Sequence, residues 1–174
     1  MQYGPRRSDV IFTLAIVAAC IFTLGGLMWL GAKKGLSSEE AAAAEGKSNR
    51  EVAMSCTTDM ATEFHIHPFL TIMIDGEKRT IPTDVGIVDG CMHPLHTHDE
   101  LGKLHVESPV KRDFTLGDFF AVWDKPFDKD HILDKTVDAE HEIRLLVNGK
   151  LSQDYENLVL HDEDQIMISY QKKQ

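Results

Sequence analysis

The sequence predicts an α+β fold in which a mostly antiparallel β domain with one central helix follows one N-terminal transmembrane helix. Three patterns indicate this fold. Residues 10–32 form an uncharged apolar run, residues 64–74 alternate polar and apolar side chains with the period of a strand, and residues 115–123 carry a helical stripe of apolar side chains.

The apolar run VIFTLAIVAACIFTLGGLMWLGA of residues 10–32 is long enough to cross a bilayer, since a span needs about 20 apolar residues. Basic pairs flank its two ends, at residues 6–7 and 33–34. A cleaved secretory signal is the alternative, but the apolar region of such a signal is shorter, about 7–15 residues, and ends at a small-residue cleavage site. We therefore predict a short tail over residues 1–9 and a single-pass transmembrane helix over residues 10–32.

Both flanks of the run are basic, so the rule that basic residues favour the cytoplasmic side barely separates the two orientations. A short tail before an anchor of this kind usually stays in the cytoplasm, and we therefore expect an extracytoplasmic domain. Residues 33–61 are predicted to be a linker or stalk with one short helix over residues 39–45, which offers only alanine for burial. The soluble domain is predicted over residues 62–174.

The chain is acidic, with a formal net charge of −10 at pH 7. An acidic surface repels phosphate backbones, which excludes nucleic acid as an expected partner, and it concentrates cations near the domain. The expected partners are the lipid bilayer and a metal ion, and the anchor is compatible with recruitment into a larger membrane protein complex.

The first predicted strand covers residues 64–74, and its side chains alternate between two faces. The face assigned to the core carries Ile66, Leu70, Ile72 and Ile74. His65 and His67 lie on the opposite face. Asp75-Gly76 predicts a hairpin turn, and the return strand is expected over residues 78–81.

The remaining elements follow the same reasoning. Thr115 with an acidic residue three positions later predicts the capped start of a helix over residues 115–123. The C-terminal part returns to strand, over residues 142–147 and 165–170, with an Asn148-Gly149 hairpin turn after the first of these.

Histidines are the residues that could bind a metal ion. Six of the nine lie between residues 65 and 105, namely His65, His67, His93, His96, His98 and His105. A His-x-His pair on a strand places two imidazoles on one face about 7 Å apart at Cα, so that both can reach one ion. A further strand over residues 104–107 turns Leu104 and Val106 to the core and His105 and Glu107 away from it.

We therefore predict a metal site, because neutral imidazole suits copper and zinc, and also iron. The predicted ligands are His65, His67, His96, His98 and His105. Asp99 and Glu107 are close enough in sequence to be outer hydrogen-bond acceptors that fix the ring tautomers. The alternative is a set of ordinary surface histidines, which a single His-x-His pair would favour. The others are interpreted as ordinary polar residues: His93, His131, His141 and His161.

Two of the three cysteines, Cys56 and Cys91, each precede a histidine pair. In an oxidising compartment outside the cytoplasm they would form a disulfide, which is the pairing we predict. In the cytoplasm Cys91 could instead be a thiolate ligand, and its spacing to His96 suggests a blue-copper site. Such sites need an axial ligand, often Met, and the next methionine after His96 is the distant Met167.

Several strings also carry a family resemblance. They are FHIHPFLTI with the following Asp-Gly, IPTDVGI, CMHPLHTHDELGKLHVESP and FTLGDFFAVW, spread over about residues 56–124. In these strings the chain resembles a family of uncharacterised, usually membrane-anchored proteins of archaea and bacteria. The resemblance implies an anchored domain organised around these histidines, and it implies no reaction. A weaker likeness is to cupins, but the spacing from His98 to Glu100 or Glu107 departs from the cupin pattern.

Two classes of function fit these residues. The first is a non-catalytic metal-binding protein on the outer face of the membrane. The second is a metal-dependent enzyme, oxygen-using or hydrolytic, with an open coordination position. Five nitrogen ligands would saturate an ion and favour binding alone, whereas three would leave room for chemistry.

Overall fold

The structure is a computed structural model that describes residues 46–58 and 62–173. The predicted transmembrane helix (10–32) and the predicted alanine-rich helix of the linker (39–45) lie outside the described residues. Within the described ranges, no helix has the length and the apolar character that a membrane span requires.

The described part is a mostly β domain with a few short helices, which confirms the predicted α+β class at this level. The elements, in chain order, are α3 (Asn49–Ala53), β1 (Phe64–Ile66), β2 (Phe69–Ile74), β3 (Glu77–Arg79), β4 (Ile87–Val88), β5 (Cys91–Met92), β6 (Leu95–His96), β7 (His105–Ser108), α4 (Leu116–Val122), β8 (His131–Ile132), β9 (Lys135–Thr136), β10 (His141–Val147), β11 (Lys150–Ser152), a 3-10 turn η1 (Tyr155–Asn157) and β12 (Gln165–Lys172).

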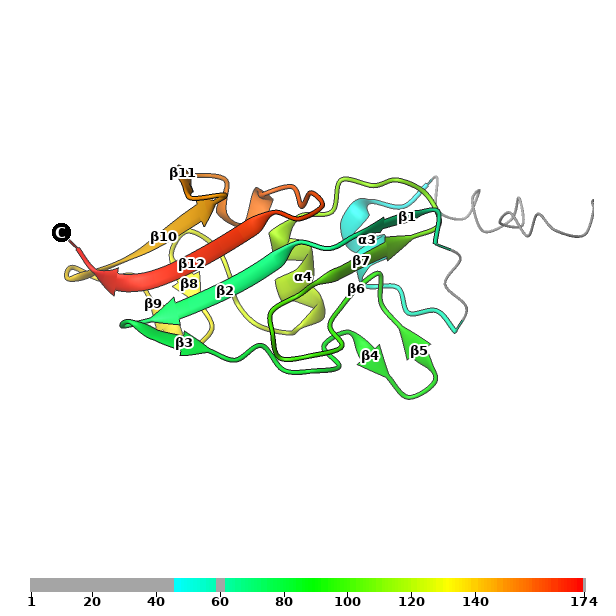
Figure 1. Ribbon diagram of the computed structural model, residues 1–174, viewed down its shortest axis with the longest axis horizontal. Helices are drawn as coiled ribbons and strands as arrows, with labels where there is room; N and C mark the ends of the chain where they lie inside the picture. Colours follow the sequence, from blue (N-terminus) through cyan, green and yellow to red (C-terminus); the bar gives the residue numbers. More distant parts are fainter. Residues whose placement is uncertain (1–45, 59–61, 174) are drawn as a thin grey trace, which may run out of the picture. The chain divides into compact units, whose positions relative to one another are not determined.

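The larger sheet has the strand order β11-β10-β12-β2-β3 (Figure 1). Its pairs are antiparallel except for β12 with β2, which run parallel with Ile168 opposite Ile72. The two predicted hairpin turns are confirmed, since Asp75-Gly76 joins β2 to β3 and Asn148-Gly149 joins β10 to β11. All four turn residues have the positive φ that such turns require.

A smaller sheet has the order β1-β7-β6, and both of its pairs are antiparallel. The pairing of β1 with β7 continues beyond the strand ends, because Leu104 N–H donates to Pro68 O at 2.9 Å and Leu70 N–H donates to Gly102 O at 2.7 Å. The segment 64–74 therefore passes from the smaller sheet into the larger one, and residues 102–108 stay beside it across the passage.

The expected single strand over residues 64–74 is divided in the structure at His67 and Pro68. Proline has no N–H to give to a ladder, so the chain bends there and changes sheet. The alternation of faces survives the bend: Leu70, Ile72 and Ile74 are buried, as predicted.

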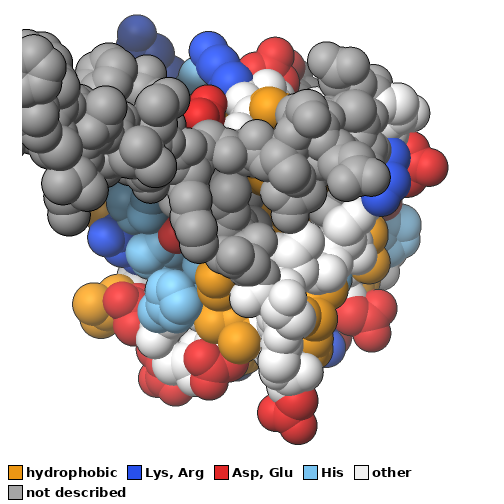
Figure 2. Space-filling model, turned by 90° about the vertical axis from the view of Figure 1, so that its right-hand side faces the viewer, with side chains coloured by type: hydrophobic (Ala, Val, Ile, Leu, Met, Phe, Trp, Pro, Cys, Tyr) orange, Lys and Arg blue, Asp and Glu red, His pale blue; other side chains and the backbone are white. Residues whose placement is uncertain are grey.

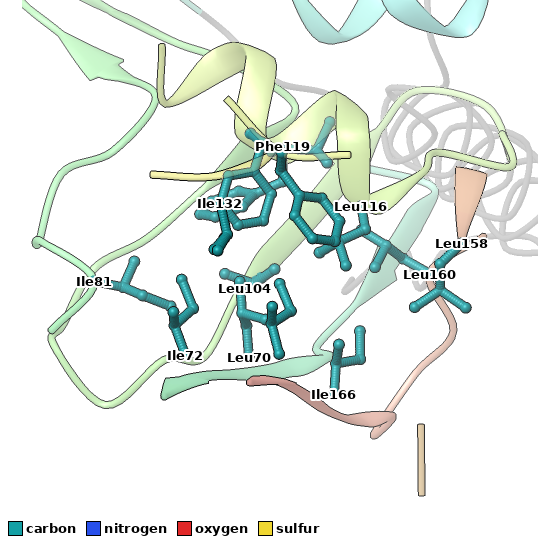
Figure 3. Close-up of a cluster of buried hydrophobic side chains, with 14 of the residues drawn as sticks. Leu70, Ile72, Ile81, Leu104, Leu116, Phe119, Ile132, Leu158, Leu160 and Ile166 are labelled. Carbon is teal, nitrogen blue, oxygen red and sulfur yellow. The ribbon is translucent and has the colours of Figure 1, made fainter. Parts of the chain in front are cut away.

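Figure 3 shows the core as a cluster of aliphatic and aromatic side chains between α4 and the strands. Leu70 and Ile72 from β2 and Ile166 from β12 lie on one side of this cluster, and Leu116 and Phe119 from α4 lie on the other. Leu104 belongs to the same core and is fully buried. The strand that carries His105 is thus held by apolar burial on its inner face.

The helix predicted over residues 115–123 is confirmed as α4 with Thr115 as its N-cap. Asp118 N–H donates to the Thr115 hydroxyl oxygen, and the Asp118 carboxylate accepts the Thr115 N–H, which closes a capping box. Asp118 also pairs with Arg50 of α3 at 2.8 Å, so the two helices are tied together. Inside the range predicted as linker (33–61), α3 buries Val52 and Ala53 in the domain core.

Gly86 marks the closest approach of a loop to β6. Its φ is +74°, and a Cβ there would collide with the carbonyl oxygen of Leu95 and lie 3.2 Å from Cβ of His96. Gly90 has a similar φ of +81° but open space around its Cα. Substitution of Gly90 therefore measures the cost of the backbone strain alone, whereas substitution of Gly86 adds the cost of the collision.

We expect Gly86→Ala to lower the free energy of unfolding by about 2 kcal/mol more than Gly90→Ala, because only the first adds overpacking to the shared positive φ. Urea denaturation of residues 46–174 in both variants measures this difference. Equal destabilisation by the two substitutions would contradict the close packing of Gly86 on β6.

Candidate metal centre

One face of the smaller sheet brings the predicted ligands together. His65 pairs with Glu107, and His96 pairs with His105, so each pair shares a face. His105 and Glu107 also share a face, because they are two residues apart on β7. This face therefore carries three histidines and one carboxylate, while the opposite face carries the apolar residues Ile66, Leu95 and Val106.

His67 and His98 lie just past the ends of β1 and β6 and complete what we term the histidine cluster, consisting of His65, His67, His96, His98 and His105. The ring of His105 is central: its centroid lies 4.7 Å from those of both His67 and His98. Its centroid is 5.3 Å from that of His96 and 5.8 Å from that of His65. Figure 2 shows histidine side chains gathered on one face of the domain, next to acidic ones.

The possible ligand atoms fall into two groups of three, and within each group all of them lie within 4.8 Å of one another. The inner triad is His96, His98 and His105, and the outer triad is His65, His67 and His105. No group of the described residues contains all five. The structure thus brings together every predicted ligand, but as two sets that share His105.

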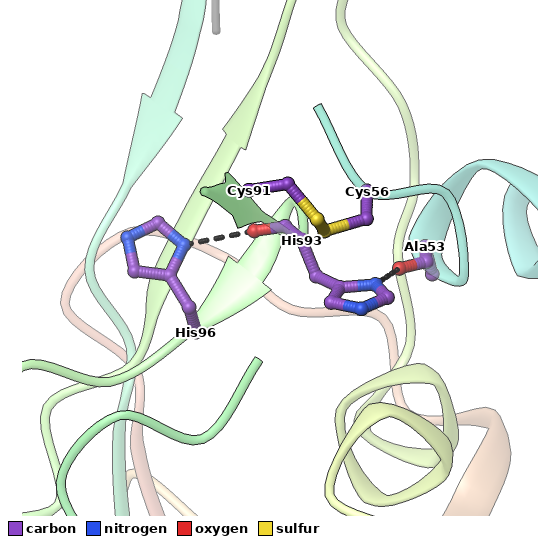
Figure 4. Close-up of a disulfide and its surroundings, with 5 residues drawn as sticks. All are labelled: Ala53, Cys56, Cys91, His93 and His96. Carbon is purple, nitrogen blue, oxygen red and sulfur yellow. Dashed lines mark hydrogen bonds between the residues drawn. A yellow bond between two sulfur atoms is a disulfide. The ribbon is translucent and has the colours of Figure 1, made fainter. Parts of the chain in front are cut away.

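His96 differs from the expectation of an off-core position, because it is fully buried. The preceding loop covers it: Thr97 N–H donates to Val85 O at 3.0 Å, and Gly86 packs against the Leu95 carbonyl and the Cβ of His96. His96 Nδ1 lies 3.0 Å from the carbonyl oxygen of His93 (Figure 4). A carbonyl only accepts, so Nδ1 carries the proton and Nε2 keeps its lone pair.

The electrostatics favour neutral rings. Burial lowers the pKa of His96 to about 4, against the smaller opposing effect of the bond to His93. Burial, followed by the neighbouring histidines, also lowers the pKa of His105 to about 4. The pKa of His67 is lowered by burial and then by Lys103. At neutral pH these imidazoles are therefore uncharged, which is the form that binds a metal.

Glu107 lies between two rings of the cluster. Its Oε1 is 3.0 Å from His65 Nε2 and 3.7 Å from His105 Nδ1. His105 Nδ1 is buried without a hydrogen-bond partner among the described residues. The carboxylate of Asp99 accepts the N–H of Leu101 at 2.8 Å, a contact inside its own turn. A role for Asp99 as acceptor for a histidine stays a prediction.

The predicted disulfide is confirmed: Cys56 and Cys91 are bonded, with their Cα atoms 5.5 Å apart (Figure 4). Cys91 is therefore not a free thiolate, which removes the blue-copper alternative. A structural disulfide is typical of a domain that folds in an oxidising compartment outside the cytoplasm.

The disulfide belongs to the frame that positions His96. Beside it, Thr57 and Met92 exchange two backbone hydrogen bonds, of 3.0 and 2.9 Å. The next residue, His93, places its Nδ1 3.1 Å from the carbonyl oxygen of Ala53 and uses its own carbonyl for His96. Sequence reasoning missed His93, although its place between Cys91 and His96 was the available signal.

The other three histidines outside the cluster each pair with an aspartate three residues away. These pairs are His131–Asp128 at 2.9 Å, His141–Asp138 at 3.0 Å and His161–Asp164 at 3.3 Å. The structure does not bring them to the cluster, which agrees with their interpretation as ordinary polar residues.

The pKa values predict how the stability of the metal-free domain depends on pH. The unfolded chain titrates its histidines near pH 6.5 and the folded domain titrates His96 near 4, so the unfolded state binds more protons between these values. The contribution of His96 to the free energy of unfolding should therefore be constant above about pH 6.5. It should fall as the pH is lowered to 4, by an amount on the order of 3 kcal/mol.

Urea denaturation of wild-type and His96→Asn domains with a chelator present, at pH 7 and pH 4, isolates this contribution because the carboxylates are common to both. The variant should lose less stability than the wild type on acidification. An identical loss in both would show that His96 is not held neutral by the fold.

Removal of the disulfide gives a separate prediction. The bond closes a loop with a sequence separation of 35 residues, so Cys56→Ser/Cys91→Ser should lower the free energy of unfolding by about 3–4 kcal/mol. Because the His93 carbonyl is held by the same segment, metal affinity should also fall, by about tenfold. Urea denaturation and metal titration measure the two effects, with Cys20→Ser in the full chain as the control. A double variant that binds metal with wild-type affinity would show that the disulfide does not help to position the metal site.

Comparison with protein-family models, with curated proteins and with solved structures finds no match to this chain. Its function is therefore inferred from the described residues of the histidine cluster and their surroundings.

Proposed function

We propose that this chain is a membrane-anchored, extracytoplasmic protein whose domain binds one transition-metal ion, copper or zinc, at the inner triad. The main support for the proposal is the environment of His96. Its side chain is fully buried, its Nδ1 is held by the His93 carbonyl, and its Nε2 has no hydrogen-bond partner among the described residues.

A buried nitrogen without a partner is costly. Leaving such a group unpaired costs about 1–3 kcal/mol, so folded proteins pair nearly all of them. A metal ion would use the lone pair that the fold leaves on His96 Nε2. His98 and His105 each offer a further ring nitrogen, and the ligand atoms of the three histidines lie within 4.8 Å of one another. Because Nδ1 of His96 is engaged by the His93 carbonyl, Nε2 is the nitrogen left for an ion.

The class of metal follows from the ligand atoms. Three imidazole nitrogens suit zinc, copper or iron, whereas calcium and magnesium take oxygen ligands. Metal-bound histidines are normally oriented through their second nitrogen by a carbonyl or a carboxylate. The His93 carbonyl serves His96 in this way, and Glu107, 3.7 Å from His105 Nδ1, is placed to serve His105.

The location of the site is supported by the disulfide and by the sequence. The disulfide fits an oxidising compartment, and the uncharged run of residues 10–32 supports the anchor. The net charge of −10 would concentrate cations near the domain. A larger membrane complex is a further partner that the anchor would serve.

A metal-dependent enzyme is the second candidate, and the size of the triad favours it. Three protein ligands leave at least one coordination position for water or a substrate, as in catalytic zinc sites. Full occupation of the coordination sphere by protein nitrogens would instead favour a carrier or sensor.

The proposal predicts which histidine is needed for the metal. We expect His98→Ala to lower the affinity for zinc and copper by more than about 100-fold, because the ion loses one of three nitrogen ligands. His161→Ala, which removes an exposed histidine paired with Asp164, should leave the affinity unchanged. Competition with a chromophoric chelator, using full chain in mild detergent, gives both affinities.

Metal content by mass spectrometry, after reconstitution with copper, zinc and iron in turn, completes the test. A wild-type chain that stays metal-free with all three ions would contradict the proposal. So would equal affinities in the His98 and His161 variants.

A further inference from the structure

The second triad is the feature that the proposed function does not use. His65 and His67 approach His105 from β1, while His96 and His98 approach it from β6. Metal–nitrogen bonds are about 2.0–2.1 Å long, so the nitrogens around one ion are at most about 4.2 Å apart. An ion centred in one triad is therefore not bound by the whole of the other in the described geometry.

His105 also limits how many ions can bind at once. A neutral imidazole has a proton on one ring nitrogen and a free lone pair on the other. It can therefore serve one ion at a time. Simultaneous occupation of both triads would require His105 to lose its remaining proton.

The two triads differ in their access to solvent. Each triad has one exposed member, His65 in the outer triad (40% exposed) and His98 in the inner triad, but only the inner triad contains a fully buried one, His96. Negative charge lies beside the outer pair: Glu107 contacts His65, and Asp162 accepts the backbone N–H of His67 at 2.8 Å. The positive charge of Lys103 partly offsets this negative charge: after burial, it is the next cause that lowers the pKa of His67. No residue of the outer triad is fully buried, so a cation arriving from solvent can reach all three of its histidines before it reaches His96.

We infer that the histidine cluster offers a single ion two alternative positions, with His105 as the ligand common to both. This inference rests on the proposed function. The outer triad receives the ion from solvent, and the inner triad retains it. During the transfer His65 and His67 leave the ion and His98 and His96 replace them, so the ion is never without a protein ligand.

The transfer is balanced in charge and protons. Each imidazole enters and leaves as a neutral ligand, and no electron is exchanged. His65, once released, can return to its contact with Glu107, 3.0 Å away in the described structure. The burial of His96 makes release from the inner position slow, because the bond from the ion to a buried nitrogen must break first.

The test uses Zn²⁺ as the probe and the full chain in mild detergent. Stopped-flow mixing with a chromophoric chelator gives the loading and release rates, and mass spectrometry gives the stoichiometry. The variants are His65→Ala/His67→Ala for the outer position, His96→Asn/His98→Ala for the inner position and His105→Ala for the shared ligand. His131→Ala/His161→Ala is the control, with two histidines removed outside the cluster.

We expect the wild type and the outer variant to bind one ion per chain, with loading of the outer variant slowed at least about tenfold. The inner variant should bind one ion weakly and release it at least about tenfold faster than the wild type. His105→Ala should bind none stably, and the control should match the wild type.

Three outcomes would overturn the inference, although a chain that gives any of them still binds a transition metal. They are two ions bound per wild-type chain at pH 7, loss of binding in the outer variant, and loading of the outer variant at the wild-type rate. The second of these would instead indicate a single site with more than three histidine ligands. A wild type that binds no ion would overturn the proposed function itself.

Discussion

The antiparallel register between residues 64–70 and 102–108 is the constraint on which the rest of the domain depends. It places His65 opposite Glu107, and it continues through the bonds of Pro68 and Leu70 into the larger sheet. The same register turns Val106 into the core and His105 away from it. One pairing thus fixes both the apolar packing under the smaller sheet and the shared ligand above it.

Much of this domain was predictable from local patterns. Alternation identified the buried side chains of β2, the Thr115 cap located α4, and the Asp-Gly and Asn-Gly pairs located two hairpins. The five histidines were found from the spacing of two His-x-His pairs and a strand that turns His105 from the core. These signals succeed because each depends on residues close together in the chain.

Long-range features could not be predicted in this way. His96 is buried because a loop some ten residues earlier packs over it, and His93 matters because a segment tied by Cys56 holds it. The parallel pairing of β12 with β2 joins segments about a hundred residues apart. The division of the five ligands into two triads likewise depends on how β1 and β6 flank β7, which sequence spacing does not specify.

On this proposal the inner triad is the resting position of a transition-metal ion. An anomalous-difference map at the zinc absorption edge, from crystals of the zinc-loaded protein, tests it directly. We expect one dominant peak about 2.0–2.1 Å from a ring nitrogen of each of His96, His98 and His105. A peak only at the exposed histidine–aspartate pairs, such as His131 with Asp128, would contradict it.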